Sequence, residues 1–242
     1  MTSLTLPHRL RAKCVTLCPK FVRVWVKERA ELSFWHSKHQ NERVLRNDHY
    51  RFFYTSFFKL NEEAYHGCRI LDIGCGPRGS LEWADMALER VGLDPLVDRY
   101  RALGIDDHRM SYCHAAVEAI PYNTDHFDRV MSFNSLDHVD NLLQALSEIS
   151  RVIKSGGMFL LIVEVNHAPT PTEPVEITET ELKANLLASY EIASWEAYQL
   201  RNDHDIYRSL REGTPRESLL VGQTGIIAAK MVKRSTTPSI DN

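Results

Sequence analysis

Residues 69–79 read Arg-Ile-Leu-Asp-Ile-Gly-Cys-Gly-Pro-Arg-Gly, a short apolar run that ends in closely spaced glycines. The run at 69–73 is typical of a buried strand. Glycine adopts positive φ and lets the backbone approach a ligand, so this strand-to-loop junction predicts a cradle for a cofactor. The spacing Gly74-x-Gly76-x-x-Gly79 also matches the dinucleotide fingerprint, which alone does not identify the cofactor.

An acidic residue follows the next predicted strand. Residues 91–93 form this strand, and Asp94-Pro95 ends it because proline cannot continue an internal ladder. A carboxylate at this position can accept hydrogen bonds from both hydroxyls of a ribose. The glycine turn and Asp94 together predict a nucleoside site without naming the cofactor.

The surrounding chain alternates strands and helices, as successive βαβ units do. Further strands are predicted at 110–113, 127–133 and 158–165, and helices at 80–90, 96–103 and 142–153. After a proline-rich loop at 168–174 we expect a helix at 178–189 and strands at 190–200 and 219–231, separated by a polar stretch at 201–218. The segment 21–58 is predicted to be helical. This divides the chain into an N-terminal helical extension or lid (1–63), one α/β domain (64–232) and a flexible tail (233–242).

Composition excludes several classes of protein. The 242 residues are 43% hydrophobic and 25% charged, as in soluble globular domains. The longest apolar run, 158–163, is far shorter than the roughly 20 residues of a membrane span. A net charge of −3 gives no overall attraction for nucleic acid, although a basic amphipathic surface in the first thirty residues could contact an anionic membrane or nucleic acid. That basic set is Arg9, Arg11, Lys13, Lys20, Arg23, Lys27 and Arg29.

The cysteines favour a reducing compartment. There are five, in no framework spacing, and no cleavable apolar leader is evident, so we expect a cytoplasmic protein. Cys14 and Cys18 with His8 lack a second ligand pair at zinc-like spacing. No metal site is predicted.

The motifs in series resemble those of the class I S-adenosylmethionine-dependent methyltransferases, of the methyltransferase type 11 kind. Residues 71–77 and 92–95 resemble the first two motifs of that family, and 117–122 with 127–130 the next two. Residues 136–139 and 151–157 complete the series in the right order. The resemblance covers about residues 69–166. It implies a Rossmann-like fold with a mostly parallel seven-stranded sheet flanked by helices, S-adenosylmethionine as cofactor and S-adenosylhomocysteine as product.

The family pattern also implies roles for particular residues. Asp72 would hold the cofactor's ammonium group, Gly74 and Gly76 would approach its methionine part, and Asp94 would bind the ribose. The full set of predicted cofactor-binding residues is Asp72, Gly74, Cys75, Gly76, Asp94, Pro95, Leu96, Val117, Glu118 and Asn134. Ala116 departs from the pattern, since many members carry an acidic residue there toward the adenine amino group.

The acceptor side is less defined. Ligands of open α/β sheets lie beyond the carboxyl ends of the strands, which nominates His138, Asp137 and Glu164 as catalytic residues. His138 can act as a base or simply pack locally. Arg51, Tyr54, Trp35 and Asn166 are predicted to contact the substrate, with Arg51 binding a carboxylate.

The sequence therefore predicts a methyltransferase that acts on a small molecule, such as a sugar, a lipid-linked compound or a specialised metabolite, by in-line displacement at an O, N or C atom. The acceptor and the oligomeric state are left open. Three alternatives stay open: an RNA or protein methyltransferase, a non-catalytic protein that binds the cofactor or a partner, and a dinucleotide oxidoreductase.

Overall fold

The computed structural model describes residues 20–170, 173–220 and 222–235. The strands are β1 (Arg69–Ile73), β2 (Glu89–Asp94), β3 (Ser111–His114), β4 (Phe127–Phe133), β5 (Ile153–Val165), β6 (Tyr190–Gln199) and β7 (Gly225–Lys233). They form a seven-stranded sheet in the order β3-β2-β1-β4-β5-β7-β6. β7 runs antiparallel to both of its neighbours, and the pairs from β3 to β5 are parallel. The predicted α/β class and mostly parallel seven-stranded sheet are confirmed.

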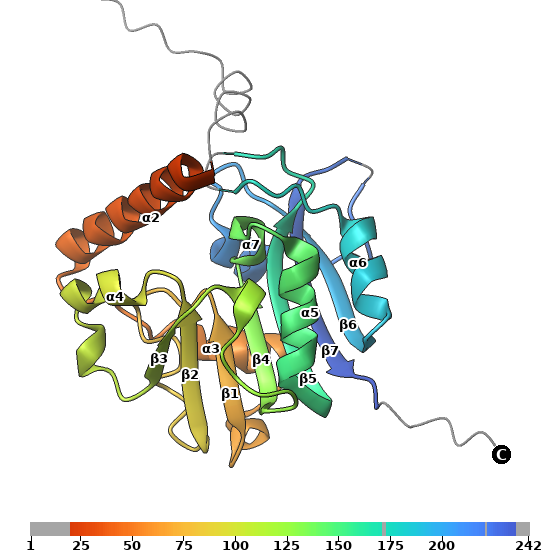
Figure 1. Cartoon of the computed structure of the whole chain (residues 1–242). Helices are drawn as coiled ribbons and strands as arrows, with labels where there is room; N and C mark the ends of the chain where they lie inside the picture. The colour runs from red at the N-terminus through yellow and green to blue at the C-terminus, as the bar shows by residue number, and fades with distance from the viewer. Residues whose placement is uncertain (1–19, 171–172, 221, 236–242) are drawn as a thin grey trace, which may run out of the picture.

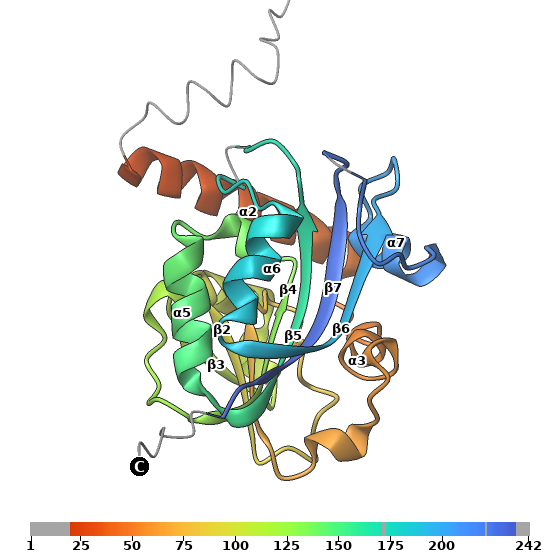
Figure 2. The same cartoon turned by 90° about the vertical axis from the view of Figure 1, so that its right-hand side faces the viewer.

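Helices cover both faces of the sheet. The α-helices are α2 (Lys20–Glu42), α3 (Tyr50–Tyr54), α4 (Val97–Tyr100), α5 (Leu142–Val152), α6 (Glu179–Leu187) and α7 (Ile206–Glu212). Figure 2 shows α5 and α6 on one face and α3 and α7 on the other. α2 lies across the end of the sheet at which the β5 arrow points, as Figure 1 shows.

The strands alternate their side chains between two cores, as the two-residue period of a strand requires. Leu71 and Leu161 face the core under α5 and α6. Ile70 and Leu160, their neighbours in the chain, face the second core, which contains Phe53 of α3. A third, smaller cluster packs the α4 region against Leu45, Leu32 and Trp35, which ties α2 to the domain.

The helix predicted over residues 80–90 is wrong. Consecutive turns replace it, with i+3 to i backbone bonds such as Glu82 N to Gly79 O at 3.1 Å and Ala84 N to Leu81 O at 3.1 Å. The Glu82 carboxylate accepts the N–H groups of Arg109 and Met110, which are distant in sequence. These long-range bonds and the complete burial of Leu81 and Ala84 override the helical propensity of the segment.

Other elements differ at their limits. The polar stretch 201–218 contains α7, whose N-cap Asp205 accepts a bond from Arg208 N, and β7 begins only at Gly225. The helical segment 21–58 is divided into α2, α3 and η1 (Ser56–Phe58). Lys233 belongs to β7, whereas residues 236–242 of the predicted tail lie outside the described residues. In the part of the chain that is described, no helix combines the length and apolar character needed to cross a membrane.

Candidate functional site

A large cavity of about 1660 Å³ opens at the carboxyl ends of β1, β2 and β4. Its inner wall comes from the loops that follow these strands. α2 and the segment 203–212 contribute the opposite wall. All ten residues predicted to bind the cofactor line this one cavity.

The glycine turn is held in a shape that only glycine allows. Gly74 and Gly76 have φ of +69° and +57°, in the left-handed region. A Cβ on Gly74 would lie 2.3 Å from the Ser135 Cβ, and one on Gly76 would lie 2.8 Å from the Trp35 ring. The Gly74 N–H donates to the Leu93 carbonyl at 2.8 Å, which fixes the turn to the end of β2.

Asp94 is pre-positioned by backbone donors. Its Oδ1 accepts the Leu96 N–H at 2.8 Å and its Oδ2 accepts the Gly76 N–H at 3.2 Å. Each oxygen retains a lone pair that can accept a ribose hydroxyl. Burial raises the pKa of Asp94 to about 6, although both backbone bonds favour the ionised form.

Asp72 lies on the methionine side of the cradle. Its carboxylate accepts the Tyr54 hydroxyl at 2.8 Å and the Ser80 hydroxyl. Burial raises the pKa of Asp72 to about 7, and the nearby Asp94 adds to the shift. Burial also raises the pKa of the Cys75 thiol well above its usual value, so this thiol is neutral. Two buried carboxyl groups facing one cavity favour a cationic ligand.

The adenine side of the cradle is apolar. Val117 and Leu96 are almost fully buried, and Pro95 lines the cavity beside them. The Glu118 carboxylate lines the cavity but accepts the N–H groups of Asp140 and Asn141 at 2.7 and 3.1 Å. Glu118 therefore fastens the loop before α5.

Three of the residues predicted on the acceptor side also reach the cavity: His138, Tyr54 and Trp35. Within α2, the Trp35 Nε1–H donates to the Glu31 carboxylate at 2.7 Å. The Tyr54 hydroxyl donates to the Asp72 carboxylate. Asn134, a predicted cofactor residue, has φ of +54°, and its buried Oδ1 has no hydrogen-bond partner.

The remaining four predicted residues, Asp137, Glu164, Arg51 and Asn166, are not among the residues that line the cavity. The Arg51 side chain is 62% exposed and pairs with Glu62, because the period of α3 buries Tyr54 and turns Arg51 outward. The Asn166 side chain bonds Gln223 O and Glu179 N, so it fixes loops.

Several cavity residues were missed by the sequence analysis, including Arg78, His49, Tyr207, Arg208 and Arg211. Arg78 donates to both carboxylate oxygens of Glu42, at 2.7 and 2.8 Å, and lies over the Trp35 ring at 5.5 Å. This pair lowers the pKa of Glu42 to about 2 and fastens the end of α2 to the glycine turn. The arginine after Pro77 was visible in the sequence, but its partner was not.

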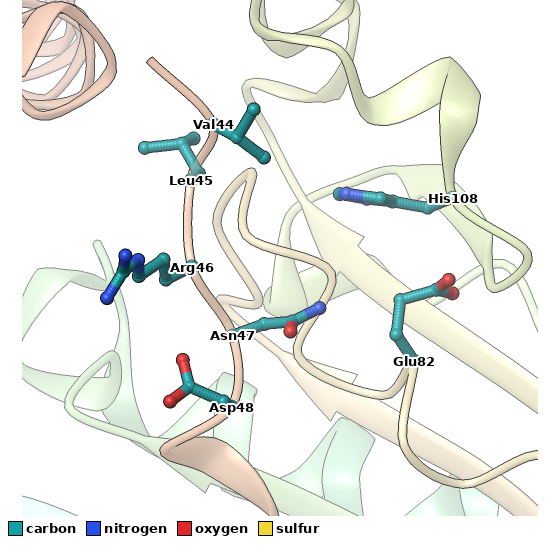
Figure 3. Close-up of a pocket in the computed structure, with 7 residues that line it drawn as sticks. All are labelled: Val44, Leu45, Arg46, Asn47, Asp48, Glu82 and His108. Atoms are coloured by element: carbon teal, nitrogen blue, oxygen red, sulfur yellow. The ribbon is translucent and has the colours of Figure 1, made fainter. Parts of the chain in front are cut away.

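A second pocket of about 460 Å³ lies between residues 44–48 and the Glu82–His108 side of the domain. Figure 3 shows Asn47, Glu82 and His108 facing this hollow. Their polar groups are engaged: Asn47 donates to Gly79 O at 3.2 Å, and His108 Nδ1 lies 2.6 Å from the Tyr112 hydroxyl. The cofactor motifs do not contribute to it.

The structure combines a mostly parallel α/β sheet with a cavity at its carboxyl edge, and two buried carboxyl groups, Asp72 and Asp94, line that cavity. Residues 71–161 match the family model of the methyltransferase domain. This match identifies a methyltransferase domain in the chain, as the motifs predicted, and S-adenosylmethionine is the cofactor that the resemblance to class I methyltransferases implies. The enzyme class predicted from the sequence, a methyltransferase, is confirmed at the level of this domain.

Curated relatives agree with this assignment. The chain is 31% identical to the methyltransferase GfsG of Streptomyces halstedii over 114 residues, which cover 41% of each chain. It is 36% identical to a malonyl-[acyl-carrier protein] O-methyltransferase of Enterobacter lignolyticus over 94 residues, covering 37% of this chain and 36% of the relative. It is 29% identical to the ubiquinone/menaquinone biosynthesis C-methyltransferase UbiE of Bordetella parapertussis, covering 64% of this chain and 61% of the relative. The chain thus spans less than two thirds of the length of each.

Solved structures share the fold over more of the chain. The first is a complex between the Haloferax volcanii Trm112 methyltransferase activator and a methyltransferase; the match has a TM-score of 0.58 at 18% identity and covers 84% of this chain and 98% of that chain. An S-adenosylmethionine-dependent methyltransferase from Mesorhizobium loti matches with a TM-score of 0.51 at 19% identity, covering 70% and 92%.

The residues present fit the cofactor. Its sulfonium and ammonium groups are cationic, and Asp72 and Asp94 supply two buried carboxyl groups on one cavity. The left-handed glycines let the turn pack directly against Ser135 and Trp35, which a Cβ at either position would prevent.

Proposed function

We propose that this protein is an S-adenosylmethionine-dependent methyltransferase that methylates a small-molecule acceptor. The observation that carries the proposal is the gathering of all ten predicted cofactor residues on one cavity, which continues under α2 and α7. The cofactor, when bound, supplies a methyl group activated by the sulfonium. The chain's own residues then have to orient the cofactor and acceptor in line and exclude water.

The proposed cofactor contacts are those that the family resemblance implies, and the geometry of the cavity supports them. Asp94 accepts the ribose hydroxyls through its remaining lone pairs, and Asp72 binds the ammonium group, directly or through water. Val117 and Leu96 provide the apolar surface for adenine, with the backbone of Val117 at its edge. The absence of an acidic side chain at Ala116 leaves adenine to backbone bonds and packing.

We propose that α2 is the lid that excludes water from the cavity. Its Trp35 ring lies against Gly76, and the Arg78–Glu42 ion pair and the Arg78–Trp35 contact hold it closed over the turn. The Lys27 ammonium group reaches across to the His138 carbonyl oxygen. The lid therefore bridges the glycine turn and the loop after β4.

The acceptor side lies around His138, which lines the cavity beyond the glycine turn. Of the three residues predicted to be catalytic, it alone is among those that line the cavity. The names of the curated relatives point to different acceptors, an acyl-carrier-protein-bound malonyl group for one and a quinone precursor for another. We therefore propose the class of acceptor, a small or carrier-linked molecule, and not its identity.

Cytoplasmic location is part of this proposal and is supported by the lack of a membrane-spanning helix in the described residues. Membrane contact through the basic N-terminus stays a prediction. Residues 1–19, with Arg9, Arg11 and Lys13 of the basic set and with His8, Cys14 and Cys18, lie outside the described part of the chain, whereas the other four basic residues belong to α2.

The direct test is methyl transfer from radiolabelled S-adenosylmethionine to pooled acceptors, grouped as hydroxyl, amine, thiol and activated-carbon compounds. We expect one pool to be labelled by the wild type and not by Asp94→Ala. His138→Gln should reduce turnover about 100-fold with cofactor affinity unchanged. Cofactor binding without transfer to any pool, RNA or protein included, would support the non-catalytic alternative.

A further inference from the structure

A cluster of carboxylate and imidazole groups lies beyond the carboxyl ends of β4 and β5. Asp137 and His138 belong to the short helix η6 (Leu136–His138) after β4, and Glu173 comes from the loop between β5 and α6. One ligand atom from each lies within 4.8 Å of those of the other two. Opposite ligands of a first-row metal ion stand about 4 Å apart, so small side-chain rotations suffice to close the set on an ion.

The Asp137 carboxyl group is buried and only partly hydrogen-bonded. Asp137 is 2% exposed, and its Oδ1 has no hydrogen-bond partner among the described residues. The His138 Nε2 atom lies 3.9 Å from Oδ1, beyond hydrogen-bond distance. An isolated buried carboxyl group is stable in its ionised form only when it is paired or bound to a metal, so a cation at this oxygen would stabilise the carboxylate.

His167, at the end of β5, offers a second unpartnered atom. Its Nδ1 lies 3.1 Å from the Ala168 carbonyl oxygen, which can only accept, so Nδ1 carries the proton. In the neutral ring Nε2 is then a bare lone pair, and it is buried with no partner. Metal-ligating histidines commonly have this arrangement, with the other ring nitrogen donating to a backbone carbonyl.

Negative charge concentrates at this point. Burial raises the pKa of Asp137 and of Glu164, and in both cases the charge of Glu173 adds to the shift. Glu173 is held toward the cluster by Thr170, whose hydroxyl donates to the Glu173 carboxylate at 3.0 Å and accepts the Glu173 N–H at 2.9 Å. A divalent ion would relieve the repulsion among the three carboxylates.

We propose that Asp137, His138 and Glu173 bind a divalent first-row metal ion, with His167 beside them. Two carboxylates and an imidazole suit Mn²⁺, Fe²⁺ or Zn²⁺. His138 and Glu173 also line the large cavity, so the ion faces the acceptor side. This role rests on the proposed function: an acceptor hydroxyl bound to the ion would lose its proton to water, and its oxygen would take the methyl group from the sulfonium, which would leave as the neutral thioether. His138 would then not be needed as a base.

The second pocket provides an internal contrast. Glu82 and His108 also approach one another there, both lying within 3.0 Å of the Cβ position of Gly79. Their polar atoms already bond Arg109 N, Met110 N and the Tyr112 hydroxyl. A carboxylate and an imidazole satisfied by the protein itself do not require an ion.

The test uses Mn²⁺, which prefers oxygen and imidazole ligands over thiolates, so cysteines do not compete. The full chain is stripped with chelator and titrated with Mn²⁺, and free Mn²⁺ is followed by electron paramagnetic resonance. We expect one site per chain, weakened at least about 100-fold in Asp137→Asn and Glu173→Gln. His138→Gln should weaken it similarly, whereas His108→Gln, the same change in the second pocket, should leave it unchanged.

Each variant is also titrated with S-adenosylhomocysteine, which reports folding of the cofactor half independently. The metal site is overturned if the wild type does not bind Mn²⁺, or if Asp137→Asn and Glu173→Gln bind it as tightly as His108→Gln does. Mn²⁺ binding without cofactor binding would instead count against the proposed function and leave the metal site supported.

Discussion

Two groups of buried acids lie at the carboxyl edge of the same sheet, and their hydrogen bonding differs. Asp72, near the end of β1, and Asp94, the last residue of β2, accept hydrogen bonds from hydroxyl and backbone donors of the domain itself. Asp137, after β4, is equally buried but leaves an oxygen without a partner. The carboxyl groups of Asp72 and Asp94 are therefore held in place by the protein before a ligand binds. The Asp137 carboxyl group still has an oxygen that a ligand could bind. On the two proposals above, this difference distinguishes the cofactor site from the metal site.

We expect the largest effect on stability at the contact of Gly74 with Ser135, which joins the loops after β1 and β4. Gly74→Ala would place a Cβ 2.3 Å from the Ser135 Cβ at a φ of +69°. We expect a loss of about 3 kcal/mol in the free energy of unfolding, measured in urea, from overpacking and backbone strain together. Gly156→Ala is the matched control, because its φ is +74° but its Cβ meets no atom within 4 Å. It should lose only about 1 kcal/mol, and equal losses would contradict the close contact.

Asp94→Ala tests the satisfied group directly. Removing a carboxylate that accepts two ribose hydroxyls should weaken S-adenosylhomocysteine binding by about 100-fold, since each charge-assisted bond contributes about 1.5–3 kcal/mol. Calorimetric titration measures this. Asp98→Ala, on α4 and exposed, is the control and should bind like the wild type. A loss below about threefold in Asp94→Ala would remove Asp94 from the site.

Both the stability of the cofactor-free protein and its cofactor affinity should depend on pH through Asp72 and Asp94. The folded-state pKa values of Asp72 and Asp94 are raised to about 7 and about 6, above their unfolded values. The stability that these two groups contribute to the cofactor-free protein is therefore full below about pH 4 and lost as pH rises to about 7. Cofactor affinity should move oppositely and weaken about 10-fold or more from pH 7.5 to 5, because the ionised acids bind the ligand.

The measurement is the dissociation constant of S-adenosylhomocysteine across that pH range. Asp94→Asn and Asp72→Asn should each flatten the profile, since each removes one titrating group. An affinity that is independent of pH in the wild type would show that the acids do not titrate on binding.

A smaller effect is expected from Tyr54→Phe. It removes one of the two hydroxyl donors to Asp72 and leaves Ser80. We therefore expect the free energy of cofactor binding to weaken by about 1 kcal/mol, which is about fivefold in affinity. Tyr198→Phe is the control, because its hydroxyl bonds Glu196 at 2.6 Å and it does not line the cavity. An unchanged affinity in Tyr54→Phe would mean that Asp72 is positioned without it.

The cofactor-side acids Asp72 and Asp94 were predictable from the sequence because each lies at the carboxyl end of a strand. Parallel strands bring their carboxyl ends to one edge, so the order of Gly74, Gly76 and Asp94 in the chain already places them together. The same rule predicted Asn134 and His138. Arg51 lies in a five-residue helix, where the buried face depends on packing that the sequence does not reveal.

The second group depends on the path of a loop. Glu173 lies close to Asp137 although the two residues are far apart in the sequence, and no periodicity of the sequence encodes that approach. The absence of the helix predicted at 80–90 has a similar origin, since the Glu82 carboxylate accepts hydrogen bonds from backbone N–H groups that lie just before β3. Local propensity fails where long-range hydrogen bonds decide the backbone.

The central claim is that the cavity at the glycine turn binds S-adenosylmethionine. Calorimetric titration of the full chain with S-adenosylmethionine, S-adenosylhomocysteine and NAD tests it most directly. The account predicts that both sulfur-containing ligands bind at one site per chain and that NAD does not. Binding of NAD in preference to them, or binding of none of the three, would contradict it.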